Sequence, residues 1–402
     1  MTSVADAPAV EHRLLAGRMD GRLETHLKEH GPLPALDGAQ IVGAARDAGL
    51  TGRGGAGFPV WRKLNAVAGT GRPAVVIANA AEGEPASGKD KALLAYQPHL
   101  VLDGLQLAAR AAGARTAHVY APAAALGPLR ALLPQRRDAV PVTLHVAPDA
   151  FVSGEESAVA AAVAGGAAVP RDKLVRITDA GVGGAPTLVQ NVETLAHLAL
   201  IARYGPGWFR SVGTPAEPGT FLATVSGAVA APGVLEAPLG VRLGELLAAA
   251  GGPSAPLQAV LVGGFHGGWV PADLTLRVSR EALAPFGASP GAGVVLALSA
   301  ESCGLRETAR IAGYLAGQVA GQCGPCVNGL PRIAATLADL AAGRARPGLP
   351  AEVDRLARLV SGRGACRHPD GTARLVLSAL RAFDLDVHAH LTGHCLSTEE
   401  IR

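Results

Sequence analysis

All five cysteines of this 402-residue chain follow residue 300, and they are its side chains best suited to hold a soft metal. An odd number of cysteines gathered in one region is not the pattern of a disulfide framework. Cys323 and Cys326 form a Cys-x2-Cys pair. Such a pair alone is often zinc-binding or inert, so it does not by itself identify an iron–sulfur site. We expect metal or cluster ligation in this region.

A glycine-rich loop near residue 55 has the composition of an anion site. Closely spaced glycines let backbone N–H groups approach a phosphate, and the nearby Lys63 can neutralise its charge. A flexible surface loop is an equally good interpretation of the glycines alone. The loop precedes the first clear strand, so it is not a Rossmann fingerprint. Its residues are Gly52, Arg53, Gly54, Gly55, Ala56, Gly57, Phe58 and Pro59.

Polar residues follow the first strand-like run, at 74–79. Asn79, Glu82 and Glu84 stand where ligands bind in α/β sheets, at the carboxyl end of a strand. An amide and two carboxylates there can hydrogen-bond an isoalloxazine ring, a ribitol or a ribose. The alternative is a solvated turn with acids at a helix N-terminus.

Two more motifs precede helical runs. Gly154, Glu155 and Glu156 open an alanine-rich helix, where acids also simply stabilise the first turn. Residues 181–187 form a glycine loop that leads into a polar-capped helix, near Gln190 and Asn191.

Strands alternate with helices between residues 72 and 146, which predicts βαβ units and a parallel sheet. The predicted elements are strands at 74–79, 116–121 and 142–146 and helices at 91–112 and near 124–133. A Gly/Pro-rich stretch at 213–219 indicates a domain boundary, followed by a small α+β module with a helix at 243–250. From Glu301 onward the pattern is helical. We expect domains at 1–212, 220–298 and 300–402.

Composition excludes several classes of protein. The net charge of +3 and the lack of a Lys/Arg cluster argue against nucleic-acid binding. The sequence has no run of about 18 uncharged apolar residues and no apolar signal region among residues 1–11. We therefore expect a cytoplasmic protein without a transmembrane segment.

The four motifs, in this order, resemble those of the flavoprotein subunit of respiratory complex I and of its hydrogenase and formate-dehydrogenase relatives. The resemblance runs from about Gly49 to Cys366, and the order of four motifs is far more specific than any one of them. It implies an α/β fold with a Rossmann-like FMN-binding domain, a β-grasp (soluble-ligand-binding) insertion and a C-terminal helical bundle.

The resemblance also implies roles for individual residues. The glycine loop is implied to bind the FMN phosphate and the dinucleotide, with Phe58 stacked on the nucleotide. No side chain is implied as a catalytic acid or base; Glu84, Glu155 and Glu156 position the hydride transfer. The implied cofactor contacts are Gly52, Gly54, Gly55, Gly57, Phe58, Lys63, Asn79, Glu82, Glu84, Gly154, Glu155, Glu156, Gln190, Asn191 and Thr194.

Apart from the cysteines, the chain departs from the family pattern at four positions. Ala81 replaces an Asp, and Phe151 replaces a Tyr and so lacks its hydroxyl. Ala66 and Arg176 stand where aromatic residues sandwich the adenine. Because arginine can stack on a purine or pair with a 2′-phosphate, NADPH becomes a hypothesis beside NADH.

The family places four cysteines as C-x2-C-x2-C with the fourth about 40 residues later. The resemblance makes Cys323, Cys326 and Cys366 three of these metal ligands, whereas Ala320 occupies the first position. Three interpretations stay open: a [4Fe–4S] cluster with a substitute ligand, a [3Fe–4S] cluster, or loss of the cluster. The candidate substitute ligands are Cys395, His394 and His368. Cys303 matches a non-ligand cysteine and is expected to be a buried apolar residue.

The implied function is an FMN-dependent NAD(P)H oxidoreductase that passes electrons through an iron–sulfur cluster. Its expected acceptors are a ferredoxin, an iron–sulfur partner subunit or a quinone-reducing membrane complex. The alternative is a non-catalytic paralogue that serves as a scaffold or assembly protein, which Ala66, Ala81 and Ala320 favour. The intact glycine loop and the Gly154–Glu156 motif favour catalysis.

Overall fold

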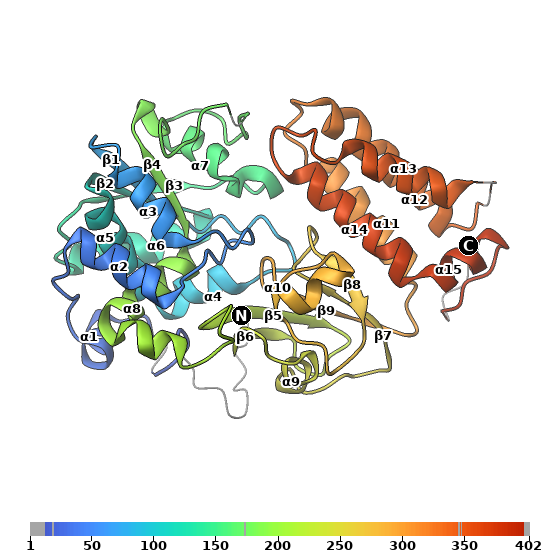
Figure 1. Ribbon diagram of the computed structural model, residues 1–402, viewed down its shortest axis with the longest axis horizontal. Helices are drawn as coiled ribbons and strands as arrows, with labels where there is room; N and C mark the ends of the chain where they lie inside the picture. The colour runs from blue at the N-terminus through green and yellow to red at the C-terminus, as the bar shows by residue number, and fades with distance from the viewer. Residues whose placement is uncertain (1–12, 18–19, 173, 345, 347, 398–402) are drawn as a thin grey trace.

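The computed structural model describes residues 13–17, 20–172, 174–344, 346 and 348–397. These residues form three parts that lie side by side (Figure 1): an N-terminal α/β part, a second sheet next to it, and a group of C-terminal helices. This arrangement confirms the predicted fold class.

The N-terminal part is built on a four-stranded sheet in the order β3-β2-β1-β4, with all neighbours parallel. The strands are β1 (Ala74–Asn79), β2 (Ala114–Ala121), β3 (Val142–Val146) and β4 (Thr187–Asn191). The surrounding helices are α1 (Leu23–His30), α2 (Gly38–Ala48), α3 (Val60–Ala68), α4 (Lys89–Tyr96), α5 (Pro98–Ala112), α6 (Ala123–Leu132), α7 (Glu156–Val163) and α8 (Val192–Arg210). Helix α5 is buried along almost its whole length and packs on both β1 and α8.

Two elements of this part differ from the sequence prediction. The single helix expected at 91–112 is two helices, α4 and α5, which separate at Gln97. Proline disfavours helical backbone in the residue before it, and Gln97, which precedes Pro98, has φ −133° and ψ 47°. The short strand β4 was not predicted, because its five residues follow a glycine loop and run directly into α8.

The second sheet has the strand order β6-β5-β9-β7-β8, in which β5 and β9 are parallel and the other neighbours are antiparallel. Its strands are β5 (Thr220–Gly227), β6 (Gly233–Pro238), β7 (Leu257–Val262), β8 (Gly268–Pro271) and β9 (Val294–Ser299), with helices α9 (Leu243–Ala249) and α10 (Arg280–Leu283). This is the expected β-grasp arrangement, with a separate core under α9.

The C-terminal helices are α11 (Gly304–Gly317), α12 (Leu330–Ala341), α13 (Leu349–Val360), α14 (His368–Ala382) and α15 (Asp384–Leu391). A π-helical turn at Pro325–Gly329 leads into α12. Buried leucine, isoleucine and valine side chains from α11 to α14 form one core, which also includes Trp269 of β8. Among the described residues, no helix has both the length and the apolar character that crossing a bilayer requires.

Candidate functional site

Polar side chains from two neighbouring strands meet at the carboxyl edge of the parallel sheet. The register pairs Asn79 at the end of β1 with Asn191 at the end of β4. Asn79 donates from its amide to the backbone oxygen of Gly154 over 2.9 Å. Gln190 is buried beside them, and its amide nitrogen has no hydrogen-bond partner among the described residues. The edge therefore holds an unpaired donor where α/β proteins bind ligands.

The glycine loop is closed on itself and anchored to α8. Its ends are joined by a hydrogen bond from the Gly52 backbone N–H to the Phe58 oxygen, 2.9 Å long. The backbone N–H of Arg53 donates to the Thr194 hydroxyl oxygen at 2.8 Å. The Thr194 hydroxyl therefore holds the glycine loop in place through this hydrogen bond.

Gly57 shows why this loop requires glycine. Its φ is +62°, and a Cβ placed there would lie 2.0 Å from the guanidinium of Arg280. Arg280 comes from α10 of the β-grasp part and donates to the backbone oxygen of Gly55 over 3.3 Å. The second sheet therefore contributes a cation to the glycine loop, which sequence motifs did not indicate.

A buried ion network lies beneath the loop. The Lys89 ammonium lies 2.5 Å from the Glu193 carboxylate and 3.4 Å from that of Asp90, and all three side chains are buried. Burial lowers the pKa of Lys89, but the two carboxylates outweigh it and raise the pKa overall. Lys89 also donates to the Arg53 backbone oxygen at 3.0 Å. The network holds the loop against α8.

This network was not among the sequence-based site residues, although Lys89, Asp90 and Glu193 lie within or beside the motifs. Charged side chains are mostly solvated, so only their burial in the fold reveals that they pair. Asn191 donates to Asp90 over 2.6 Å and accepts from the Glu193 backbone N–H at 3.0 Å. Its side chain therefore joins the network to the sheet edge.

The two acids after β1 have different surroundings. Glu82 accepts hydrogen bonds from the Ser87 hydroxyl and the Asp90 backbone N–H, at 2.5 and 3.1 Å, and so caps α4. Glu84 accepts from the Phe265 backbone N–H at 2.7 Å. Burial raises the pKa of Glu84 to about 7. Glu84 is therefore a carboxyl group that changes charge near neutral pH at the junction with the β-grasp part.

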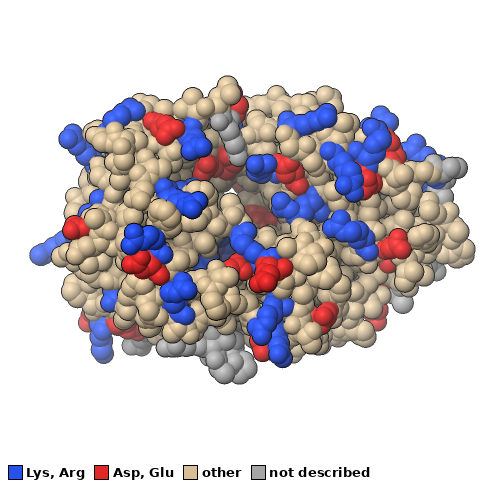
Figure 2. Space-filling model, in the orientation of Figure 1, with Lys and Arg blue, Asp and Glu red and all other residues tan. Residues whose placement is uncertain are grey.

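The remaining predicted contacts to be placed are Lys63, Glu155, Glu156 and Phe58. The Lys63 ammonium forms an ion pair with Glu156 at 2.7 Å, which joins α3 to α7. Glu155 caps α7 by accepting from the Ser157 backbone N–H at 2.8 Å. Phe58 is 46% exposed, a high value for a large apolar side chain. Figure 2 shows a hollow near the centre of this face, with basic and acidic side chains around it.

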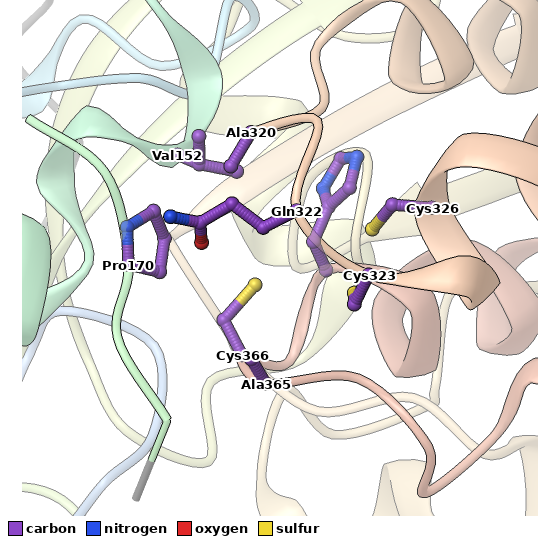
Figure 3. A pocket seen from close by; sticks show the side chains of 9 residues that line it. Val152, Pro170, Ala320, Gln322, Cys323, Cys326, Ala365 and Cys366 are labelled. Carbon is purple, nitrogen blue, oxygen red and sulfur yellow. The ribbon is translucent and has the colours of Figure 1, made fainter.

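Three thiols line a pocket in the C-terminal part, named here the thiol pocket: Cys323, Cys326 and Cys366. Figure 3 shows their sulfur atoms directed toward a common space, with the Gln322 side chain beside them. Cys326 and Cys366 are buried. Burial, together with the neighbouring Cys323 and Cys366, raises the pKa of Cys326 to about 12. Three converging sulfurs, two of them buried, form a donor set for a soft metal or a cluster.

The fourth side of the thiol pocket holds no thiol. It is formed by Ala320 and Gln322. His368 also lines the pocket, but its ring nitrogens already contact His266 at 3.0 Å and the Leu315 backbone oxygen at 2.8 Å.

The other two suggested substitute ligands are placed differently. His394 is exposed and contacts Thr392. Cys395 lies with Cys303 and His390 and does not line the thiol pocket. Cys303 is buried, as expected. Its neighbours include His390 and Cys395 as well as apolar side chains.

Residues 151–156, named here the bridging segment, connect the sheet edge to the thiol pocket. On one side, the segment lies against the residues after β1: a Cβ on Gly83 would lie 2.4 Å from the Phe151 oxygen, and one on Gly154 would lie 2.8 Å from the Ala81 oxygen. On the other side, Val152 lines the thiol pocket. The Phe151 ring packs on His266, with centroids 4.5 Å apart. The two candidate binding regions are therefore separated by one short segment.

Comparison with known families matches each part of the chain. Residues 45–200 match the Nuo51 FMN-binding domain, 222–265 match the SLBB domain, and 306–390 match the NADH-ubiquinone oxidoreductase-F iron-sulfur binding region.

Relatives match over most of their length. An F-type subunit of the NADH-quinone oxidoreductase of Rhizobium meliloti (strain 1021) is 31% identical over 373 residues, which cover 88% of this chain and 89% of the relative. The corresponding F-type subunit of Streptomyces coelicolor is 30% identical, covering 88% and 83%. The solved structure of an NAD+-reducing [NiFe]-hydrogenase in the H2-reduced state superposes with a TM-score of 0.85 at 31% identity, covering 97% of this chain and 68% of that one. This chain therefore belongs to the family of NADH- and FMN-binding flavoprotein subunits of NADH-quinone oxidoreductases and NAD-linked hydrogenases, whose members are oxidoreductases of the NADH dehydrogenase class.

Proposed function

We propose that this chain takes electrons from a reduced nicotinamide dinucleotide through FMN at the sheet edge and delivers them to an iron–sulfur cluster in the thiol pocket. The observation that carries the proposal is the bridging segment. Its Gly154 contacts the end of β1, and its Val152 lines the pocket of the three thiols. A donor and an acceptor of electrons would therefore be neighbours in the fold.

The residues at the sheet edge fit a flavin nucleotide. The buried amide nitrogen of Gln190 needs a hydrogen-bond acceptor, and it stands at the carboxyl end of β4. The glycine loop passes close to Asn191, since a Cβ on Gly54 would lie 3.3 Å from that of Asn191. The predicted contacts thus surround one edge of one sheet, where a phosphate would meet backbone N–H groups and the N-terminus of α8.

When bound, FMN would accept a hydride from the nicotinamide and release electrons one at a time. The chain supplies binding, orientation and exclusion of water. Phe58 offers a half-exposed ring for stacking on the nucleotide. Glu84, Glu155 and Glu156 position the dinucleotide, and no side chain acts as a catalytic acid or base.

The thiol pocket fits an iron–sulfur cluster with three protein ligands. Cys323, Cys326 and Cys366 supply the thiolates, and the apolar side chains of Val152, Pro170 and Ala365 border the same space. Both nitrogens of His368 are engaged, which favours a cluster that has no fourth protein ligand. A [3Fe–4S] cluster or a [4Fe–4S] cluster with one non-protein ligand meets this condition.

The electrons would leave to a ferredoxin or to an iron–sulfur subunit of a larger complex. The relatives named above are subunits of such complexes. NADH is the expected reductant. NADPH is a second candidate because Arg176 is an exposed cation and Ala66 offers no ring for stacking.

The test is an anaerobic absorbance spectrum of the purified protein, followed by titration with NADH and then NADPH. We expect flavin bands that bleach on addition of nucleotide and a broad iron–sulfur absorbance that decreases with them. A protein that stays colourless after FMN and iron–sulfur reconstitution would contradict the proposal and favour the scaffold alternative.

A further inference from the structure

A second group of metal-ligating side chains lies outside the thiol pocket. The Sγ atoms of Cys303 and Cys395 and a ring nitrogen of His390 all lie within 4.8 Å of one another. Cys303 is the N-cap residue of α11, His390 lies in the last turn of α15, and Cys395 follows α15. Cys303 and His390 are buried. Three segments of the chain therefore bring soft donor atoms to one point.

The imidazole of His390 is oriented as a ligand. Its Nδ1 lies 3.2 Å from the Leu340 backbone oxygen, and its Nε2 lies 3.5 Å from the Cys303 sulfur. A carbonyl oxygen only accepts hydrogen bonds, so Nδ1 is the donor to Leu340, and Nε2 is the ring nitrogen that faces the sulfur. Metal-bound histidines are held in this way by a second hydrogen bond.

Cys303 needs a nearby positive charge if it is to become a thiolate. Burial, together with the nearby Cys395, raises the pKa of the Cys303 thiol to about 12. The backbone N–H groups of Arg306 and Leu305, at the start of α11, act in the opposite direction. A metal ion would supply the charge that makes the thiolate stable there. Asp386, one turn before His390, is buried, and one of its carboxylate oxygens has no partner among the described residues.

This group is separate from the thiol pocket. Cys303 precedes α11 whereas Ala320 and Cys323 follow it, and the 14 residues of that helix span about 20 Å. Likewise Cys366 precedes α14, whereas α15 follows it (Figure 1). A metal ion at one end could not share ligands with a cluster at the other.

We propose that Cys303, His390 and Cys395 bind a Zn2+ ion, with water in the fourth position. Two thiolates and one imidazole are a ligand set typical of zinc, and a fourth, open position is common when the protein supplies three ligands. Binding would release the two thiol protons to solvent. The ion would fasten the segment after α15 to the N-terminus of α11.

The experiment measures zinc and iron in the full-length protein, purified anaerobically without chelators, by elemental analysis and by zinc-edge X-ray absorption. We expect about one zinc per chain, with two sulfur neighbours at about 2.3 Å and a nitrogen neighbour at about 2.0 Å. Cys395→Ser, at a partly exposed position, should lose most of the zinc and keep its iron. Cys366→Ser should show the reverse, and His388→Ala, an exposed neighbour on α15, should keep both metals.

Three results would overturn the proposal. One is a wild-type protein that contains no zinc and takes up no tight equivalent of added Zn2+. Another is zinc that persists in both Cys395→Ser and His390→Ala, or that disappears in Cys366→Ser instead. The third is a disulfide between Cys303 and Cys395 under anaerobic purification, found by mass spectrometry. None of these depends on flavin or nucleotide binding, so the proposed oxidoreductase function can fail or stand independently.

Discussion

The thiol pocket and the Cys303–His390–Cys395 group each bring together three soft ligands at an end of α11, yet their surroundings differ. The thiol pocket is lined by Val152 and Pro170 from the N-terminal part. The other group is placed by α11, α15 and the Leu340 oxygen of α12, all within the C-terminal helices. Ligand number is therefore a poor guide to role. Under the proposed function, only a site that touches the N-terminal part is placed to exchange electrons with a flavin bound there.

The largest effect should come from removing a thiol of the pocket. Cys366→Ser should lose most of its iron and reduce NADH-driven reduction of a one-electron acceptor by on the order of 100-fold or more, while NADH still bleaches the flavin. Iron analysis and acceptor assays measure this. Cys395→Ser is the matched control and should keep its acceptor activity. Equal losses in the two variants would remove the distinction between the sites.

The bridging segment should be sensitive to a single methyl group. A Cβ on Gly83 would lie 2.4 Å from the Phe151 oxygen, so Gly83→Ala should force the segment to move and cost about 1–3 kcal/mol. We expect a lower thermal midpoint, a lower FMN content and slower electron output. Gly43→Ala is the control, because Gly43 lies in α2 with no heavy atom within 4 Å of its added Cβ. A Gly83→Ala protein with normal FMN content would show that the contact is dispensable.

Adding a thiol at position 320 tests whether a cluster with four protein ligands differs from one with three. Ala320 lines the pocket, so Ala320→Cys can supply a fourth sulfur. We expect iron and acid-labile sulfide to approach four of each per chain, and the cluster to survive in air on the order of tenfold longer. Time courses of iron release measure this. Unchanged stoichiometry and lifetime would mean that residue 320 does not face the cluster.

The effect confined to a change of pH concerns the charge of Glu84, at the junction with the β-grasp part. Burial raises its pKa from 4.5 to about 7, so the folded protein holds this proton more tightly than the unfolded chain. Its contribution to stability is therefore fully present below pH 4.5 and is lost as the pH rises through 7, by roughly 1–3 kcal/mol.

Thermal unfolding of wild-type and Glu84→Gln proteins from pH 4.5 to 8 tests this sign. Glu84→Gln should gain stability relative to the wild type as the pH rises. Glu281→Gln, at an exposed position of α10, should run parallel to the wild type. A constant difference between the wild-type and Glu84→Gln proteins would show that the carboxyl group does not titrate in this range.

Much of the fold could be predicted because local pattern reports local structure. The apolar run at 74–79 and the alternation at 142–146 became β1 and β3 with the same bounds. Prediction was weaker at Pro98. The helical pattern continues across this proline, but the proline ends one helix and begins the next. Prediction was also weaker for β4, whose five residues are too few to establish a period.

The candidate site was predicted in part for a related reason. The glycine loop, Glu84 and the bridging segment are recognisable as motifs, and their roles as cofactor contacts stay predictions. Arg280 could not have been associated with Gly57, because the two are 223 positions apart and no pattern links them. Lys89 and Glu193 gave no sign of pairing, since burial of both charges depends on how α4 and α8 pack.

The sequence pattern by itself determined the parallel sheet, a small α+β module and the helical end, because these depend on residue type and short-range spacing, and the resemblance to a known family added the β-grasp assignment and the three family cysteines. Only the tertiary structure decided which cysteines meet. Cys395 and Cys366 are separated by fewer residues than Cys395 and Cys303, yet Cys395 lies with Cys303. The C-terminal helices have 8 to 15 residues and are rigid rods about 12 to 22 Å long, so which residues meet depends on which helix ends lie together and not on distance along the chain.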